Sequence, residues 1–157
     1  MRGKLAMLFA VSFLLCSCSP EDLISKSFAA TASTKLSSQF IGSWSLVSFT
    51  DKNEQGDTIH RYGEDAFGRI VYGVNGKMMV ILMRSGRESQ GEPDFFSYTG
   101  SYDIDEAAGA VTHHVEACNA PSWIGTDRVR TFEFLDEDRV ALRPVEGTSE
   151  LVWRREN

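Results

Sequence analysis

The stretch GRIVYGVNGKMMVILMR, residues 68–84, decides the predicted fold. Two runs of mostly β-branched, aromatic and apolar residues, 68–74 and 77–84, flank the dipeptide Asn75-Gly76. Asn-Gly between two such runs favours a tight hairpin turn, because both residues tolerate the positive φ angles that the turn requires. Residues 68–84 are therefore predicted to form an antiparallel β-hairpin.

The second strand of this hairpin is apolar on both faces. Successive side chains of a strand point to opposite sides of the sheet. One face carries Met78, Val80 and Leu82, and the other carries Met79, Ile81 and Met83. We expect the first face to line the interior of the fold and both faces to be covered.

The same alternation of short strands and turns continues on both sides of the hairpin. Further strands are predicted over residues 43–50, 58–61, 98–103, 110–117, 129–135, 139–143 and 149–155. No long amphipathic helix remains to connect parallel strands. The fold class is therefore predicted to be all-β, a single up-and-down antiparallel β-barrel of about eight strands, with a β-sandwich as the alternative.

The N-terminus has the pattern of an export signal. Arg2 and Lys4 precede the apolar run 5–15, which is too short to cross a bilayer as a helix but fits the apolar region of a signal peptide. The next residues, Leu15-Cys16-Ser17-Cys18, resemble the bacterial lipobox. This resemblance implies that cleavage leaves Cys18 as a lipidated N-terminus, carrying diacylglycerol and an acyl chain such as palmitate.

Several chains anchor a protein more firmly than one, so the membrane attachment is predicted to be lipid. By the same resemblance, a residue other than Asp after the cysteine, here Ser19, implies the outer membrane, on the periplasmic side or the surface, if the cell has one. Two alternatives stay open. Cys16 competes as the lipidation site, and a later cleavage near residues 29–32 would leave a soluble periplasmic protein.

The predicted organisation is a signal peptide over residues 1–17, a lipidated flexible tether over 18–39 and a barrel domain over 40–157.

The formal charge of the chain is −6, and loss of Arg2 and Lys4 with the signal would make it more negative by two units. An acidic domain argues against nucleic-acid binding, which depends on Lys and Arg. After lipidation of Cys18, Cys118 is the only free thiol of the mature chain, so we expect no intramolecular disulfide and no cysteine-rich zinc site. No cofactor is predicted.

The barrel region resembles a known family. Gly42-Ser43-Trp44 is similar to the Gly-x-Trp signature of lipocalins. An ordered series continues with residues 62–65, 68–72, 76–78, 111–116, 123–126 and 151–155 and resembles the bacterial and fungal lipocalin-like domains. The resemblance spans residues 40–155. It implies a barrel whose closed end is plugged by Trp44 and whose interior takes a small apolar or amphipathic molecule.

The leading hypothesis is a lipid-anchored envelope protein that binds a small hydrophobic ligand inside the barrel. Its cavity is predicted to be lined by some of Trp44, Tyr72, Met78, Val80, Leu82, Tyr98, His113 and Phe132. One alternative is a structural lipoprotein with a barrel filled by side chains. Another is an enzyme, an isomerase or hydrolase, that uses His113 with Glu116 or an arginine.

His113 and His114 are neighbours on a strand, so they point to opposite faces and cannot chelate one metal from one side. His113 shares its face with Val111 and Val115, which predicts an interior position, and His114 is predicted to face outward. No metal site is predicted. Known nucleophile and phosphate-binding motifs are missing from the sequence, so His113 is the one weak catalytic candidate.

Arg128 and Arg130 share a strand face with Phe132 and Phe134. Two arginines inside a partly apolar barrel need acidic partners or an anionic ligand, for which a fatty acid carboxylate would serve. The alternative is that the arginine end of this face points into solvent. The sequence favours this second interpretation.

Overall fold

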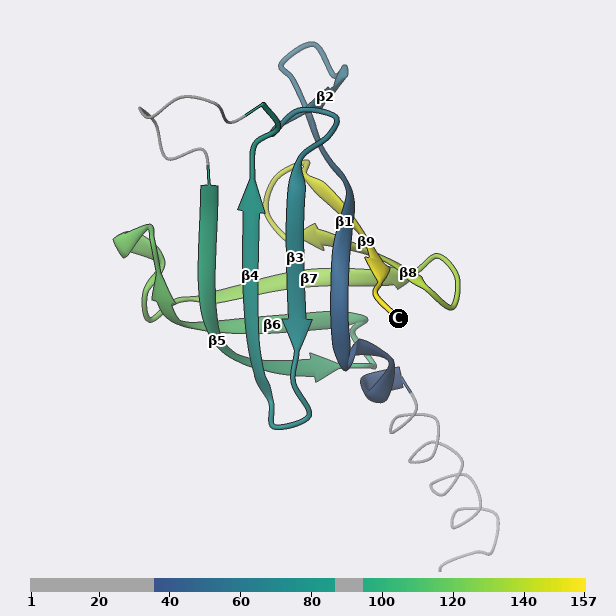
Figure 1. Cartoon of the computed structure of the whole chain (residues 1–157), viewed down its shortest axis with the longest axis vertical. Coiled ribbons are helices and arrows are strands. Elements are labelled where there is room, and N and C mark those ends of the chain that lie inside the picture. The colour runs from purple at the N-terminus through teal and green to yellow at the C-terminus, as the bar shows by residue number, and fades with distance from the viewer. Residues whose placement is uncertain (1–35, 87–94) are drawn as a thin grey trace, which may run out of the picture. The chain divides into compact units, whose positions relative to one another are not determined.

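The computed structural model describes residues 36–86 and 95–157 (Figure 1). The strands run in the order β1 Gly42–Lys52, β2 Thr58–His60, β3 Phe67–Tyr72, β4 Lys77–Met83, β5 Phe95–Asp105, β6 Ala110–Cys118, β7 Asp127–Phe134, β8 Arg139–Pro144 and β9 Glu150–Arg155. A short 3-10 helix, η1 (Pro121–Trp123), lies between β6 and β7, and residues 36–40 are helical. The predicted signal peptide and most of the predicted tether lie outside the described residues.

The strands close into a barrel. From β3 to β9 each strand pairs antiparallel with the next, β1 pairs with β3, and β9 returns to β1. Eight strands therefore form the ring, and the short β2 pairs only with the far end of β1. Figure 1 shows β3 and β4 in front, crossing β6 and β7 behind them at a steep angle. The up-and-down barrel is confirmed, and closure through β1 and β9 excludes the β-sandwich.

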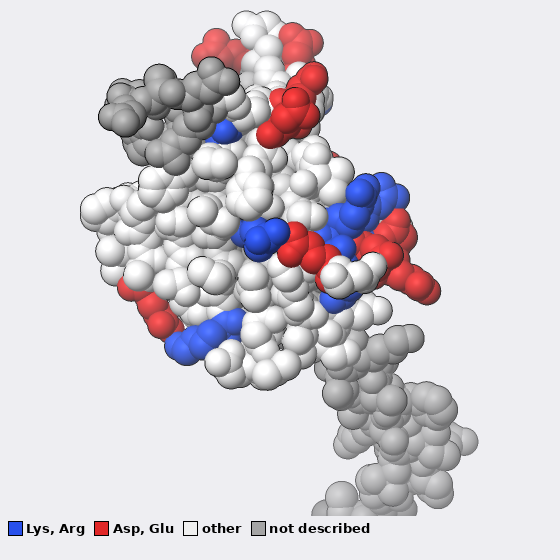
Figure 2. Space-filling model, in the orientation of Figure 1, with Lys and Arg blue, Asp and Glu red and all other residues white. Residues whose placement is uncertain are grey.

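The alternation of side chains puts the apolar core inside this ring. On β4, Met78, Val80 and Leu82 are buried as predicted. The expectation that the opposite face is also covered is wrong, because Met79 and Ile81 are 56% and 39% exposed. The outer face of a barrel needs a second layer to cover it, and the described residues supply none there. Figure 2 shows that uncharged side chains make up most of this outer face.

One end of the barrel is filled by an aromatic plug. Phe40, at the end of the helical residues 36–40, is fully buried and packs edge-on against Tyr72, Phe132 and Phe134, with ring centroids 5.3, 4.9 and 5.2 Å away. The indole Nε1 of Trp44 donates a hydrogen bond to the Phe40 carbonyl oxygen at 2.9 Å. Trp44 thus lies at the end that the lipocalin resemblance implies, and Phe40 completes the plug.

The helical residues 36–39 differ from the flexible tether expected up to residue 39. Ser37 donates hydrogen bonds to the Glu106 side chain, and Arg155 donates to the carbonyl oxygens of Gln39 and Ile41. These contacts hold the segment against the barrel end. Among the described residues, no helix is long and apolar enough to span a bilayer.

Gly100 allows the close approach of two backbones where β5 pairs with β6. The register shifts between Thr99 and Gly100, so the ladder contains a bulge. A Cβ atom on residue 100 would lie 1.8 Å from the carbonyl oxygen of His114 and 3.1 Å from the Glu116 nitrogen. Only glycine fits this position without a backbone shift.

Gly100→Ala is predicted to destabilise the barrel by about 1–3 kcal/mol, the usual range for overpacking that forces the backbone to move. Urea unfolding followed by tryptophan fluorescence measures this. Ser101→Ala, the next position of the same strand, adds no bulk and serves as the control. Equal unfolding midpoints for the two variants would contradict the proposed close contact.

Candidate functional site

The barrel holds a cavity of about 780 Å³. Its apolar walls come from the inner faces of six strands: Phe49, Ile70, Val80, Leu82, Phe96, Leu142, Leu151 and Trp153. Val129, on the outer face of β7, lies at its edge. Tyr62, Arg61, Asp127, Pro144, Val145, Glu146 and Ser149 also line it. Since Val145 is 63% exposed, the cavity reaches the surface. It lies toward the barrel end that is opposite the Phe40 plug.

The eight residues predicted to line a cavity divide between its wall and the core. Val80, Leu82, Tyr98 and His113 line the cavity. Trp44, Tyr72, Met78 and Phe132 belong to the packed core and are not part of the cavity wall. Phe40 explains the division, because its ring occupies the space between Tyr72 and Phe132. Which of these residues contact a ligand stays a prediction.

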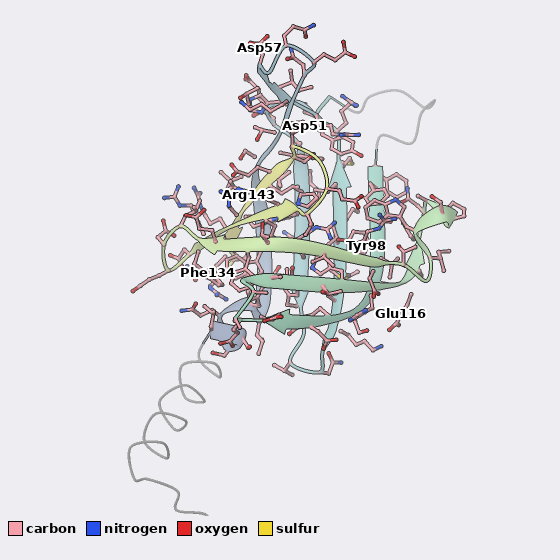
Figure 3. All side chains as sticks on the ribbon, turned by 180° about the vertical axis from the view of Figure 1, so that it is seen from behind. Asp51, Asp57, Tyr98, Glu116, Phe134 and Arg143 are labelled. Carbon is pink, nitrogen blue, oxygen red and sulfur yellow. The ribbon has the colours of Figure 1, made fainter. Side chains whose placement is uncertain are left out.

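A buried polar cluster lies where the plugged half of the barrel meets the cavity. His113 is fully buried on β6, which confirms its predicted interior position. Its Nε2 atom is 2.8 Å from the Tyr72 hydroxyl, and its Nδ1 atom is 2.8 Å from the Tyr98 hydroxyl. Tyr98 of β5 lines the cavity, whereas Phe134 packs in the plug, and Figure 3 shows the two labelled residues well apart. Tyr72, His113 and Tyr98 therefore link the core to the cavity wall.

The hydrogen-bonding capacity of this cluster leaves one tyrosine proton free. A neutral imidazole has one N–H donor and one acceptor nitrogen, so only one of the two hydroxyls can donate to it. The Tyr72 hydroxyl is enclosed in the core, where an unused donor is costly. We therefore assign the Tyr72 hydroxyl as the donor to Nε2 and Tyr98 as the acceptor from Nδ1. The Tyr98 hydroxyl proton then faces the cavity.

Burial and charge keep this cluster in its neutral form. Burial lowers the pKa of His113 well below 6.5, and the charge of Arg130 lowers it further. Burial also raises the pKa of Tyr72 and of Tyr98 above 10.0. The pairing of His113 with Glu116 is not formed, because Glu116 is on the outer face and its carboxylate binds the Lys77 ammonium at 2.6 Å. Two tyrosines hold the imidazole instead.

Arg128 and Arg130 are directed into the barrel, so the interpretation that they point into solvent is wrong. Both side chains line the cavity and are half-buried. The guanidinium carbon of Arg128 lies 3.7 Å from the ring centroid of Trp123, and that of Arg130 lies 5.9 Å from the Tyr98 ring centroid. Stacking on aromatic rings holds a guanidinium group without removing its in-plane N–H donors.

Trp123 comes from a loop that sequence reasoning left without a role. The Asn119 side chain accepts a hydrogen bond from the Ser97 nitrogen at 2.9 Å and donates to the Phe95 carbonyl oxygen at 3.0 Å, which ties the loop to β5. The turn η1 then places the Trp123 ring against Phe96, with centroids 4.6 Å apart. The sequence alternation along β7 predicts that both arginines share one face with two phenylalanines. The structure adds the position of Trp123, which holds Arg128 inside the barrel.

Two donors that line the cavity have no hydrogen-bond partner among the described residues. They are Nε of Arg128 and Nε1 of Trp153, whose indole is only 1% exposed. Buried polar groups in proteins are nearly always satisfied by protein, water or ligand. Two residues of the cavity wall therefore carry buried N–H groups without an acceptor among the described residues.

The other histidine of the pair faces outward, as predicted. On the outer face, His114 contacts Asp127 through Nδ1 at 2.7 Å and Asp103 through Nε2 at 2.9 Å. Hydrogen bonds to both carboxylates raise the pKa of His114. In the part of the chain that the structure describes, no group of three His, Cys, Asp or Glu side chains is placed to hold a metal ion.

Comparison with known families agrees with this architecture. Residues 41–155 match the family model of the lipocalin-like domain. The chain belongs to the lipocalin-like domain family. The match covers the whole ring of strands, and a lipocalin-like barrel suggests small-ligand binding. Comparison with curated protein sequences found no match.

Three solved structures are similar to this chain at low sequence identity. A DUF4847 family protein from Bacteroides vulgatus has 10% identity and a TM-score of 0.44, covering 75% of this chain and 96% of that one. A redesigned β-barrel has 13% identity and a TM-score of 0.42, covering 76% and 94%. A mutant of the fluorescent protein UnaG has 10% identity and a TM-score of 0.39, covering 76% and 98%.

The lowered pKa of His113 predicts acid sensitivity of this lipocalin-like barrel. Below pH 6.5 the unfolded chain takes up a proton that folded His113 does not, so stability falls as the pH decreases toward the folded pKa. His113→Gln should cost about 1–3 kcal/mol near neutral pH, because it disrupts buried hydrogen bonds. The variant should also lose less stability than the unmutated protein as the pH falls below neutral.

Urea unfolding across the range from neutral to mildly acidic pH measures both effects. His114→Asn is the matched control on the adjacent position. The pKa of His114 is raised, so its contribution is lost as the pH increases, and its removal should steepen the acid decline. A pH profile of His113→Gln parallel to that of the unmutated protein would disprove the neutral, buried imidazole.

Proposed function

We propose that this protein binds a small hydrophobic or amphipathic molecule inside its barrel and carries or stores it at the cell envelope. The observation that carries the proposal is the cavity of about 780 Å³ inside a lipocalin-like barrel. Ligand sites in proteins are typically cavities of roughly 300–1,000 Å³ with mostly apolar walls and a few polar groups. The cavity fits this description and argues against a barrel filled by side chains.

The chemistry of the walls supports an amphipathic rather than a purely apolar ligand. Ile70, Val80, Leu82, Leu142 and Leu151 provide aliphatic surface for a hydrocarbon portion. The Tyr98 hydroxyl and the two arginines form a polar region of the same cavity. A molecule with one apolar and one polar portion satisfies both.

The proposal also includes a lipid anchor on Cys18. Its support is the sequence: a short apolar run followed by Leu15-Cys16-Ser17-Cys18. Attachment through an N-terminal lipid would leave the barrel free at the membrane surface, within reach of amphipathic molecules. The carrier function does not require the anchor, so the two parts are tested separately.

Filling the cavity should remove the ligand. Leu82→Trp places an indole in the cavity. The control, Ile81→Trp, places the same group at the adjacent position of β4, which is on the outer face of the barrel. The protein expressed from the full-length sequence is purified and extracted with organic solvent, and the extract is analysed by untargeted mass spectrometry. We expect an enriched amphipathic molecule from the unmutated protein and from Ile81→Trp, but not from Leu82→Trp.

Overpacking at Leu82 should cost no more than about 1–3 kcal/mol, so thermal unfolding of each variant confirms that it is folded. Uptake of the neutral dye Nile red by ligand-free protein is the second measurement. A folded, unmutated protein that yields no molecule and takes up no dye would refute the carrier function.

If Cys18 carries the lipid anchor, replacing it should change both the mass of the N-terminal peptide and the cell fraction that contains the protein. Cys18→Ser should move the protein from the membrane to the soluble fraction and remove the diacylglyceryl and acyl masses from the N-terminal peptide, while Cys16→Ser should retain both. Removal of several acyl chains eliminates most of the bilayer affinity, since each buried CH₂ contributes about 0.8 kcal/mol. Membrane attachment that persists in Cys18→Ser would overturn the assignment.

A further inference from the structure

We propose, resting on the ligand-binding function above, that the ligand is an amphipathic carboxylic acid and that Arg128 and Arg130 bind its carboxylate inside the barrel. The two arginines come from alternate positions of β7 and so project from the same side of the strand. Both line the cavity together with aliphatic residues of the opposite wall. The geometry thus places two positive charges beside an apolar chamber.

Neither arginine has an acidic partner among the residues that the structure describes. In the described ranges 36–86 and 95–157, no carboxylate lies within 4.0 Å of the Arg128 or Arg130 guanidinium group. Arg130 uses one N–H to donate to the Arg128 carbonyl oxygen at 3.0 Å. Half-buried positive charges without counter-charges are costly, so an anion that enters this region gains strongly.

The acids and the third base that line the cavity do not supply that counter-charge. Asp127 faces outward and contacts Nδ1 of His114 at 2.7 Å. Glu146 is exposed, on the connection between β8 and β9. Arg61 also lines the cavity, but its guanidinium binds the Asp51 carboxylate at 2.8 Å. The unpaired charge of the cavity therefore belongs to Arg128 and Arg130.

The donors at this site are oriented and unused. Arg128 rests on the Trp123 ring by its face, and its buried Nε has no acceptor among the described residues. The Tyr98 hydroxyl is close to Arg130 and, by the assignment above, directs its proton toward the cavity. A carboxylate offers two oxygens with about four acceptor positions, which suits a guanidinium fork and an added hydroxyl.

The surroundings favour a carboxylate over a phosphate monoester or a neutral head group. A phosphate monoester carries close to two negative charges at neutral pH, and dehydrating it in a half-buried site costs more than dehydrating a monoanion. A neutral head group would leave both arginines without counter-charge. Ordered water would satisfy Nε of Arg128, but it would not neutralise either arginine.

Matched ligands that differ only in the head group test this proposal. Full-length protein stripped of bound lipid is titrated with hexadecanoate, hexadecan-1-ol and hexadecyl phosphate. Intrinsic fluorescence reports binding, because Trp123 and Trp153 line the cavity. The variants are Arg128→Met with Arg130→Met, and Arg69→Met as the matched control. Arg69 is exposed on the outer face of β3, where the Glu156 carboxylate binds its guanidinium at 2.8 Å.

We expect the unmutated protein and Arg69→Met to bind hexadecanoate about 10- to 100-fold more tightly than hexadecan-1-ol, as charge-assisted hydrogen bonds imply. The double methionine variant should lose this preference while its affinity for the alcohol is kept. Its thermal unfolding shows that it is folded. The comparison of acid with alcohol in the unmutated protein needs no variant, so the proposal stays testable if the double variant does not fold.

The other outcomes separate the two proposals. Equal affinities for acid and alcohol in the unmutated protein, or a preference that survives in the folded double variant, would overturn the carboxylate site and leave the ligand-binding function intact. Tighter binding of hexadecyl phosphate than of hexadecanoate would overturn the carboxylate assignment. Binding of none of the three, together with exclusion of Nile red, would reject the ligand-binding function itself.

Discussion

The antiparallel ladder between β1 and β9 closes the barrel, and the rest of the structure depends on it. A closed ring leaves its strands no open edge, so each strand of the ring has a hydrogen-bonded neighbour on both sides. Closure also fixes an interior of limited width, into which alternate side chains of eight strands must fit. The aromatic plug around Phe40 fills one half of this interior. The other half stays open, because the large side chains that come from the opposite end, Tyr62 and Trp123, line the wall of the cavity.

The boundary between the two halves is polar, which is unusual for the middle of a barrel. Tyr72 packs against Phe40, Tyr98 lines the cavity, and His113 connects the two hydroxyls. The two hydrogen bonds of the imidazole keep the cluster in one arrangement, because breaking either of them in a region of low dielectric constant is costly. The cluster therefore acts as a fixed floor for the cavity, with one hydroxyl group available on the open side.

Local sequence patterns predict the strands and the orientation of most interior side chains. The turn at Asn75-Gly76 defines a hairpin, and alternation along β6 identifies His113 as interior and His114 as exterior. The extent of the cavity could not be predicted, because Phe40 enters the barrel from a helical turn that no two-residue period reveals. The inward position of Arg128 depends on Trp123, which η1 brings from a separate loop. The extent of the cavity and the inward position of Arg128 both depend on contacts between separate elements. The residue pattern of a single strand carries no information about such contacts.

The arginines and the histidine cluster act on one another through their charges. Arg130 disfavours protonation of His113, so the imidazole stays a neutral connector between two hydroxyls rather than a proton acceptor. An anion beside Arg130 offsets the same positive charge that suppresses protonation. Binding of a carboxylate in the cavity is therefore linked to the pKa of His113. A bound anion weakens the part of the pKa lowering that comes from Arg130. Burial maintains the rest of the lowering. Because burial is the larger cause, the floor of the cavity keeps its hydrogen-bonded form with the ligand present or absent.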